Sequence, residues 1–139
     1  MLELDSISCG YDAFRAVHGL SLILREGDIT GLLGANGAGK SSTLMCVAGH
    51  VALQEGRILL NGEDISRLPV ARRVHAGIAI APEGRRLFKD LSVEDNLRIG
   101  GLIHPAADFR RDRDRVLDLF PRLAERLPLP AGNLSGGEQ

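Results

Sequence analysis

The chain has 139 residues, about the length of one globular domain, and is 44% hydrophobic and 25% charged, with a formal net charge of -1. A charge so close to neutral gives no electrostatic support for a nucleic-acid partner, which needs clustered excess lysine and arginine. No apolar run approaches the ~20 residues of a membrane-spanning helix, and the N-terminus lacks the basic and apolar regions of a secretion signal. The sequence therefore predicts a cytoplasmic protein that reaches a membrane only through a partner.

Alternating or continuous apolar segments predict strands in the first part of the chain. Five are expected, over residues 2–7, 20–24, 29–33, 56–60 and 78–82. Gly10 is expected to turn the chain after the first strand. Residues 29–33 are apolar on both faces, which is typical of a strand buried in the middle of a sheet. Asn61-Gly62 is a strong signal for a hairpin turn.

Helical patterns dominate the rest. Helices are expected over residues 42–47, over residues 66–76 and onward from residue 92, with another amphipathic helix over residues 116–123. Gly49 is expected to end the first of these helices and Ser92 to cap the third. The mixed charges of residues 108–115 favour a solvated helix face over a binding patch.

Cysteine and histidine spacing gives no sign of a metal centre. Cys9 and Cys46 are far apart in the sequence, which favours reduced structural cysteines. The histidines at positions 18, 50, 75 and 104 have no partner pattern, so none is interpreted as a ligand.

A glycine-rich loop carries the strongest chemical signal. It matches the pattern G-x-x-x-x-G-K-[ST] and consists of Gly34, Ala35, Asn36, Gly37, Ala38, Gly39, Lys40 and Ser41. The glycines let backbone N–H groups approach phosphates closely, and the helix that follows directs its positive end toward them. Lys40 supplies a charge for the β and γ phosphates, Ser41 a hydroxyl ligand for Mg²⁺, and Ser42 a contact to the α phosphate. This loop predicts nucleotide binding but does not distinguish kinases, GTPases, helicases and transporters.

Two further features narrow the class. With Tyr11 before the loop and LSGGEQ at residues 134–139 after it, the chain resembles the ATP-binding cassette (ABC) ATPases, whose signature motif is LSGGEQ. The segments EGRILLNGEDISRLP and APEGRRLFKDLSVEDNL are similar to the ATPase subunits of bacterial branched-chain amino acid importers. The resemblance implies an α/β fold of the P-loop type. By this resemblance, the chain would divide into three parts. These are an antiparallel β subdomain with an incomplete RecA-like core (residues 1–90), a helical subdomain (residues 91–134) and the signature (residues 134–139).

The resemblance also assigns site residues. Tyr11 matches the aromatic residue that stacks on adenine, although a core aromatic is the alternative because Phe14 is close by. Val17 would lie beside the ribose. Glu83 occupies the position where most members have a glutamine that helps to hold Mg²⁺ and the attacking water, so Ser41 and Glu83 are the candidate metal ligands and Glu83 the candidate catalytic residue. A neutral surface acid is the alternative for Glu83.

The signature has both a structural and a functional interpretation. Ser135-Gly136-Gly137-Glu138 fits the S-x-x-E capping box of a helix that begins there. In the family, the same helix start points Ser135 and Gly137 at the γ phosphate of an ATP held by a second subunit. The resemblance therefore implies a homodimer or heterodimer of ATPase subunits.

The remaining partners also follow from the resemblance. Arg85-Arg86-Leu87-Phe88 would lie at the groove for a coupling helix of a transmembrane permease subunit, and Leu87 and Phe88 either contact that helix or belong to the helical subdomain's own core. A periplasmic or extracellular binding protein would act indirectly. The protein is thus expected on the inner face of the cell membrane, held by permease subunits.

The hydrolytic machinery of the family follows its signature: an apolar strand ending in Asp-Glu, and a later histidine. No Asp-Glu pair occurs in the sequence. We therefore expect the intact protein to be an ATPase that drives an importer. Residues 1–139 are expected to be a fragment of it that binds ATP without sustained turnover. In this fragment, residues 29–33 would lack a neighbouring strand. A non-transport ABC ATPase of DNA repair or chromosome architecture, and a nucleotide-binding regulatory module without catalysis, are the alternatives.

Overall fold

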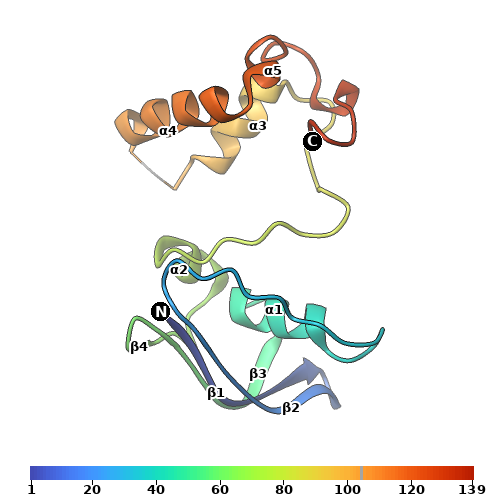
Figure 1. Ribbon diagram of the computed structural model, residues 1–139, viewed down its shortest axis with the longest axis vertical. Helices are drawn as coiled ribbons and strands as arrows, with labels where there is room; N and C mark the ends of the chain where they lie inside the picture. The colour runs from blue at the N-terminus through green and yellow to red at the C-terminus, as the bar shows by residue number, and fades with distance from the viewer. Residues whose placement is uncertain (104) are drawn as a thin grey trace. The chain divides into compact units, whose positions relative to one another are not determined.

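The computed structural model describes residues 1–103 and 105–139, and its contacts divide the chain into two units (Figure 1). The first unit spans Met1–Ile80 and the second Ala81–Gln139. His104, one of the four histidines of the sequence, lies outside the described residues. Each unit is described by itself.

The first unit is an antiparallel sheet with a helix on one face (Figure 1). Its elements are β1 (Leu2–Tyr11), β2 (Phe14–Leu24), α1 (Lys40–Ala48), β3 (Ala52–Leu60), β4 (Glu63–Asp64) and α2 (Val70–His75). The strand order is β2-β1-β3-β4. Asn61 and Gly62, with φ of 51° and 85°, form the turn between β3 and β4, so the predicted Asn-Gly hairpin is confirmed.

The turn predicted at Gly10 is wrong, because β1 continues through it to Tyr11. Gly10 pairs with Arg15 on one side and with Ala52 on the other. A Cβ atom at this position would collide with the backbone of Phe14. Gly10 therefore allows a close approach of two strands next to a register shift, which is a second common reason for glycine inside a strand.

The core of this unit lies between the sheet and α1. Its buried members are Leu4, Ile7, Cys9, Val17, Cys46, Val47, Val51, Ile58 and Ile65. The predicted helix after the glycine loop is confirmed as α1, which Gly39 precedes and Gly49 ends, both in the left-handed region with φ of 89° and 88°. Cys9 and Cys46 are free and fully buried, and burial raises the pKa of the Cys46 thiol to about 12.

Arg73 on α2 is buried, with only 4% of its surface exposed. Its guanidinium donates hydrogen bonds of 2.7 to 2.9 Å to four backbone carbonyls, those of Cys46, Val47, Ser66 and Leu68. Desolvation lowers the pKa of Arg73 from its ordinary value, and the side chain still carries its charge. Cys46 and Val47 lie in the last turn of α1, so Arg73 donates to carbonyls at this helix end. The Cys46 carbonyl also accepts from the Gly49 N–H.

Two predicted strands, over residues 29–33 and 78–82, are wrong, because neither segment is a strand. Ile29 and Leu33 are 102% and 91% exposed, so the first segment is also not buried. An apolar segment becomes a strand only when neighbouring strands take its backbone hydrogen bonds. Among the described residues, the sheet consists of β1 to β4, and neither segment pairs with it.

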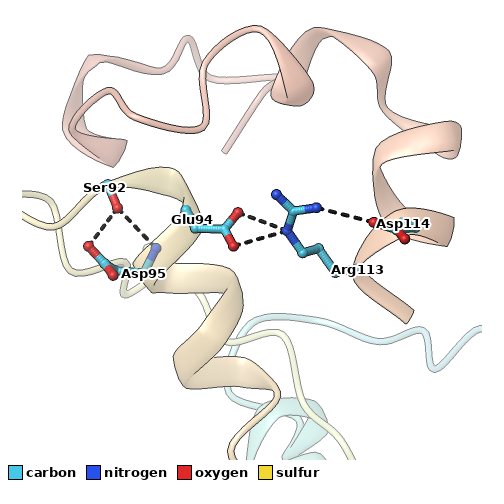
Figure 2. Close-up of polar contacts among 5 residues, drawn as sticks. All are labelled: Ser92, Glu94, Asp95, Arg113 and Asp114. Carbon is cyan, nitrogen blue, oxygen red and sulfur yellow. Dashed lines mark hydrogen bonds and ion pairs between the residues drawn. The ribbon is translucent and has the colours of Figure 1, made fainter. Parts of the chain in front are cut away.

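The second unit is helical. Its elements are α3 (Val93–Gly100), α4 (Ala106–Leu119), α5 (Pro121–Ala124) and the 3₁₀ helix η1 (Ala131–Asn133). The predicted cap is confirmed: the Ser92 hydroxyl accepts a 3.0 Å hydrogen bond from the Asp95 N–H (Figure 2). Figure 2 also shows that Nε of Arg113 donates to both carboxylate oxygens of Glu94, at 3.0 and 2.9 Å, which joins α4 to α3. Within the mixed-charge segment, Arg113 thus joins the two helices, while residues 110, 111, 114 and 115 are exposed, as predicted for a solvated face.

Candidate nucleotide-binding site

The glycine-rich loop begins at residue 34 and leads directly into α1. Residues 34–38 are exposed, and Gly37 and Gly39 have φ of 83° and 89°, a conformation that side chains other than glycine rarely adopt. Because α1 begins directly after the loop, the first N–H groups of the helix have no intrahelical acceptors and can bind an anion. The loop therefore has the backbone geometry expected of a phosphate cradle.

Lys40 lies within the curve of the loop. Its Nζ atom donates to the carbonyl oxygens of Gly34 and Ala35, at 2.9 and 2.7 Å. An ammonium group has three donors, so one of them is left for a phosphate oxygen after these two bonds. The carbonyls hold the charge at the opening of the loop, where β and γ phosphates would lie.

Ser41 and Ser42 stand in the first turn of α1. Ser41 is exposed and Ser42 is half-buried. A hydroxyl oxygen in this place is a hard donor of the type that Mg²⁺ takes. The exposed carboxylate of Glu83 is another donor of this type, but it belongs to the second unit, so the joint binding of one ion by Ser41 and Glu83 stays a prediction.

Gly39 fixes the loop to the sheet. A Cβ atom there would lie 2.7 Å from the Ala16 carbonyl oxygen and 2.9 Å from Cγ2 of Val17, so any larger residue would push the loop off β2. Val17 is 7% exposed and supports the loop from below. The sequence did not suggest this packing role for Val17, and its contact with a ribose stays a prediction.

Tyr11 ends β1 and is 56% exposed. The alternative of a core aromatic is therefore wrong. Tyr11 lies two residues after Cys9, so the two side chains leave β1 on the same face. That face carries α1, since Cys9 Sγ lies 3.7 Å from the Ser42 carbonyl oxygen. The structure thus places Tyr11 on the same face of the sheet as the helix that follows the phosphate loop.

The signature residues form a turn in the second unit. The Ser135 N–H donates to a Glu138 carboxylate oxygen at 2.8 Å, which is one half of the predicted capping box. The N–H groups of Glu138 and Gln139 both donate to the Ser135 carbonyl at 3.1 Å, as at the start of a helix. Leu134 is buried beside Val93 and Ala131, while Ser135, Gly136 and Gly137 are exposed. The exposed part of the turn is the part that the resemblance assigns to an ATP in trans.

Sequence reasoning missed three arginines around this turn. Arg126 and Arg122 lie 3.4 and 3.9 Å from Oε1 of Glu138, and Arg85 donates to the Gln139 side chain at 3.1 Å. Arg122 and Arg126 are four residues apart, a weak sign of a shared face, but nothing in the sequence pairs them with the signature. The hydrogen bond from the Ser135 backbone, followed by the charges of Arg126 and Arg122, lowers the pKa of Glu138 from its ordinary value.

We expect the Glu138 carboxyl to titrate below the usual range of glutamate, and the signature turn to loosen as the pH falls through that lowered pKa. The sign follows from linkage: a carboxyl whose pKa is depressed by folding stabilises the folded state above its unfolded pKa, and this contribution is lost on protonation. Carboxyl ¹³C NMR shifts measured against pH test it. In Arg126→Met the pKa should move upward, while in Arg115→Met, which changes an exposed arginine of α4, it should not. An unshifted Glu138 would contradict the prediction.

Leu87 and Phe88 divide between the two roles considered for them. Leu87 is half-buried and packs against the cluster of Val93, Ala131 and Leu134, so it belongs to the core of the second unit. Phe88 is 55% exposed. Phe88 alone thus has the exposure that a contact with a permease would need. None of the described helices is long and apolar enough to cross a membrane.

Comparison with known proteins confirms the resemblance of this chain to the ABC ATPases. It is 44% identical over 139 residues to the high-affinity branched-chain amino acid transport ATP-binding protein BraG of Pseudomonas aeruginosa, covering 100% of this chain and 60% of that protein. It is 33% identical to the probable branched-chain amino acid transport ATP-binding protein LivF of Archaeoglobus fulgidus, covering 100% of this chain and 59% of LivF. A solved structure, an ATP-binding cassette of an ABC transporter in its ADP conformation, matches with a TM-score of 0.79 at 26% identity, covering 99% and 60%.

The chain thus spans about 60% of the length of these relatives, and its fold is that of a P-loop ABC ATPase. The profile of the ABC transporter family matches residues 17–139, which include both the phosphate loop and the signature. On this match and on the geometry of the loop, the chain belongs to the ABC transporter family.

Proposed function

We propose that the protein is the ATP-binding and ATP-hydrolysing subunit of an ABC importer for branched-chain amino acids. The observation that carries ATP binding is the loop of residues 34–41, which places the Lys40 ammonium at its opening and the free N–H groups of α1 behind it. The 44% identity to BraG supports the solute class.

Different residues of the site would contact different parts of the nucleotide. Backbone N–H groups of residues 34–42 bind phosphate oxygens, Lys40 bonds the β and γ phosphates, and Ser41 with Glu83 would hold Mg²⁺. When bound, Mg²⁺ neutralises charge on the β and γ oxygens. Glu83 is the candidate for orienting the attacking water. Tyr11 stacks on the adenine.

Two subunits complete the site. The exposed residues Ser135, Gly136 and Gly137 of one subunit, with Glu138 holding the turn in shape, would face the γ phosphate bound by the other. Homodimers and heterodimers both satisfy this arrangement. Permease subunits would dock on the second unit near Phe88 and hold the protein at the inner face of the membrane, with a binding protein acting on the far side.

Turnover needs residues that this sequence does not contain. It has no Asp-Glu pair, and so no counterpart of the glutamate that polarises the attacking water in the family. We therefore propose that residues 1–139 bind ATP without sustained hydrolysis, and that the activity belongs to the intact protein.

Uptake measurements test the proposal. Deleting the gene is expected to lower the uptake of radiolabelled leucine, isoleucine and valine, and the wild-type gene should restore it. A gene carrying Lys40→Ala should not restore uptake, because the cradle loses its phosphate-binding charge. Normal uptake of all three amino acids after deletion, with loss of uptake of another solute, would contradict the solute class and leave the ATPase assignment standing.

A further inference from the structure

The hairpin between β1 and β2 ends in two exposed aromatic rings. Tyr11 and Phe14 are Cα partners in the last pair of the hairpin, and they are 56% and 69% exposed. Directly opposite residues of an antiparallel pair project their side chains to the same face. The two rings therefore lie side by side at the tip of the hairpin.

This face is also the face of the phosphate loop. Cys9 and Val17 are partners in the same ladder, and both are buried beneath α1 and the end of the loop. β1 keeps its alternation from Cys9 to Tyr11, because the extra residue at the register shift, Ala16, lies on β2. No strand therefore separates the two rings from the place where the phosphates of a nucleotide would bind.

The hairpin tip is held in place from its other side. Gln54 of β3 donates to the Asp12 carbonyl in the turn at 3.2 Å, and its side-chain oxygen accepts from Arg15 at 3.2 Å. Arg15 also bonds both carboxylate oxygens of Glu55, at 2.9 and 2.8 Å. These contacts tie the hairpin to β3. A hairpin whose backbone is held before a ligand arrives loses less freedom when the ligand binds.

We propose that Phe14 is a second base-contacting residue, which forms with Tyr11 a two-ring platform for the purine of a bound nucleoside triphosphate. The inference rests on the proposed function, since it needs the phosphate loop to bring a nucleotide to this face. Aromatic rings bind bases through their π faces. Phe14 thus widens the surface that a single tyrosine presents.

Substitutions at Phe14 in the protein as its gene encodes it test the platform by calorimetry with ATP and with inorganic tripolyphosphate. Phe14→Leu keeps an apolar side chain but removes the ring, and is expected to weaken ATP binding about fivefold while leaving tripolyphosphate binding unchanged. Phe14→Trp keeps a ring and should bind ATP at least as well as the wild type. Ile23→Ala is the control, because Ile23 is a similarly exposed apolar residue on β2, at 59%.

A spectroscopic readout separates stacking from a structural effect. Residues 1–139 include no tryptophan, so Phe14→Trp places a reporter at the tip. ATP should quench its fluorescence, whereas tripolyphosphate should not, and Tyr11→Ala should reduce the quenching.

The outcomes distinguish the platform from the phosphate site. ATP affinity that is unchanged in Phe14→Leu, or affinity for ATP and tripolyphosphate that falls equally, would overturn the role of Phe14 and leave the phosphate site standing. A wild-type protein that binds neither compound would overturn the phosphate site, and with it the platform.

Discussion

Lys40→Ala is expected to weaken ATP binding by about 10- to 100-fold, because it removes a charge-assisted hydrogen bond to the phosphates. The Gly34 and Ala35 carbonyls take two of the three donors of the Lys40 ammonium, which leaves one for a phosphate oxygen. Equilibrium binding of a fluorescent ATP analogue measures the loss. The effect should shrink as salt screens the charge.

Lys89→Ala is the matched control, since Lys89 is the other lysine of the sequence and lies exposed in the second unit. Its ATP affinity should equal that of the wild type. Lys40→Arg keeps the charge, but a planar guanidinium cannot occupy the place of a compact ammonium, so it should restore little binding. Equal affinities for Lys40→Ala and Lys89→Ala would exclude the loop as the phosphate site.

Arg73→Met should lower the free energy of unfolding by roughly 3 to 5 kcal/mol, because buried carbonyls would lose their donor and each unpaired acceptor costs about 1–3 kcal/mol. The acceptors belong to the last turn of α1 and to the segment before α2. The midpoint of urea denaturation measures the loss. Arg73→Lys should be intermediate, since an ammonium is a point charge that cannot reach every carbonyl.

Arg72→Met supplies the comparison for this substitution. Arg72 precedes Arg73 on α2 and is exposed, so its replacement should change the midpoint little. If the two variants unfold at the same urea concentration, the network of Arg73 does not stabilise the protein.

The features that sequence alone could predict are those set by local chemistry. The left-handed glycines of the phosphate loop, the Asn61-Gly62 turn and the Ser92 cap each depend on a few neighbouring residues, and all three are found. The signature turn is similar, because the bond from Ser135 to Glu138 spans only three residues. Such features depend little on the rest of the fold.

The features that sequence alone could not predict depend on distant partners. Residues 29–33 have the composition of a buried strand, yet burial and pairing come from other strands, and here Ile29 is fully exposed. Nothing in the sequence of α2 distinguishes Arg73 from Arg72, yet Arg72 is exposed and Arg73 is buried. Arginine is rarely buried, and its hydrogen bonds to backbone carbonyls of α1 and of the segment before α2 explain it here.

Arg73 also determines which part of the site can move. It fastens α1 at the end farthest from the phosphate loop, which opposes movement of the helix along its axis when a ligand binds at the other end. Any adjustment to the arrival or departure of phosphate is then confined to residues 34–39, where Gly37 and Gly39 permit backbone rotation. The rate of nucleotide exchange should therefore depend on how readily the backbone of residues 34–39 changes conformation, while α1 keeps its position.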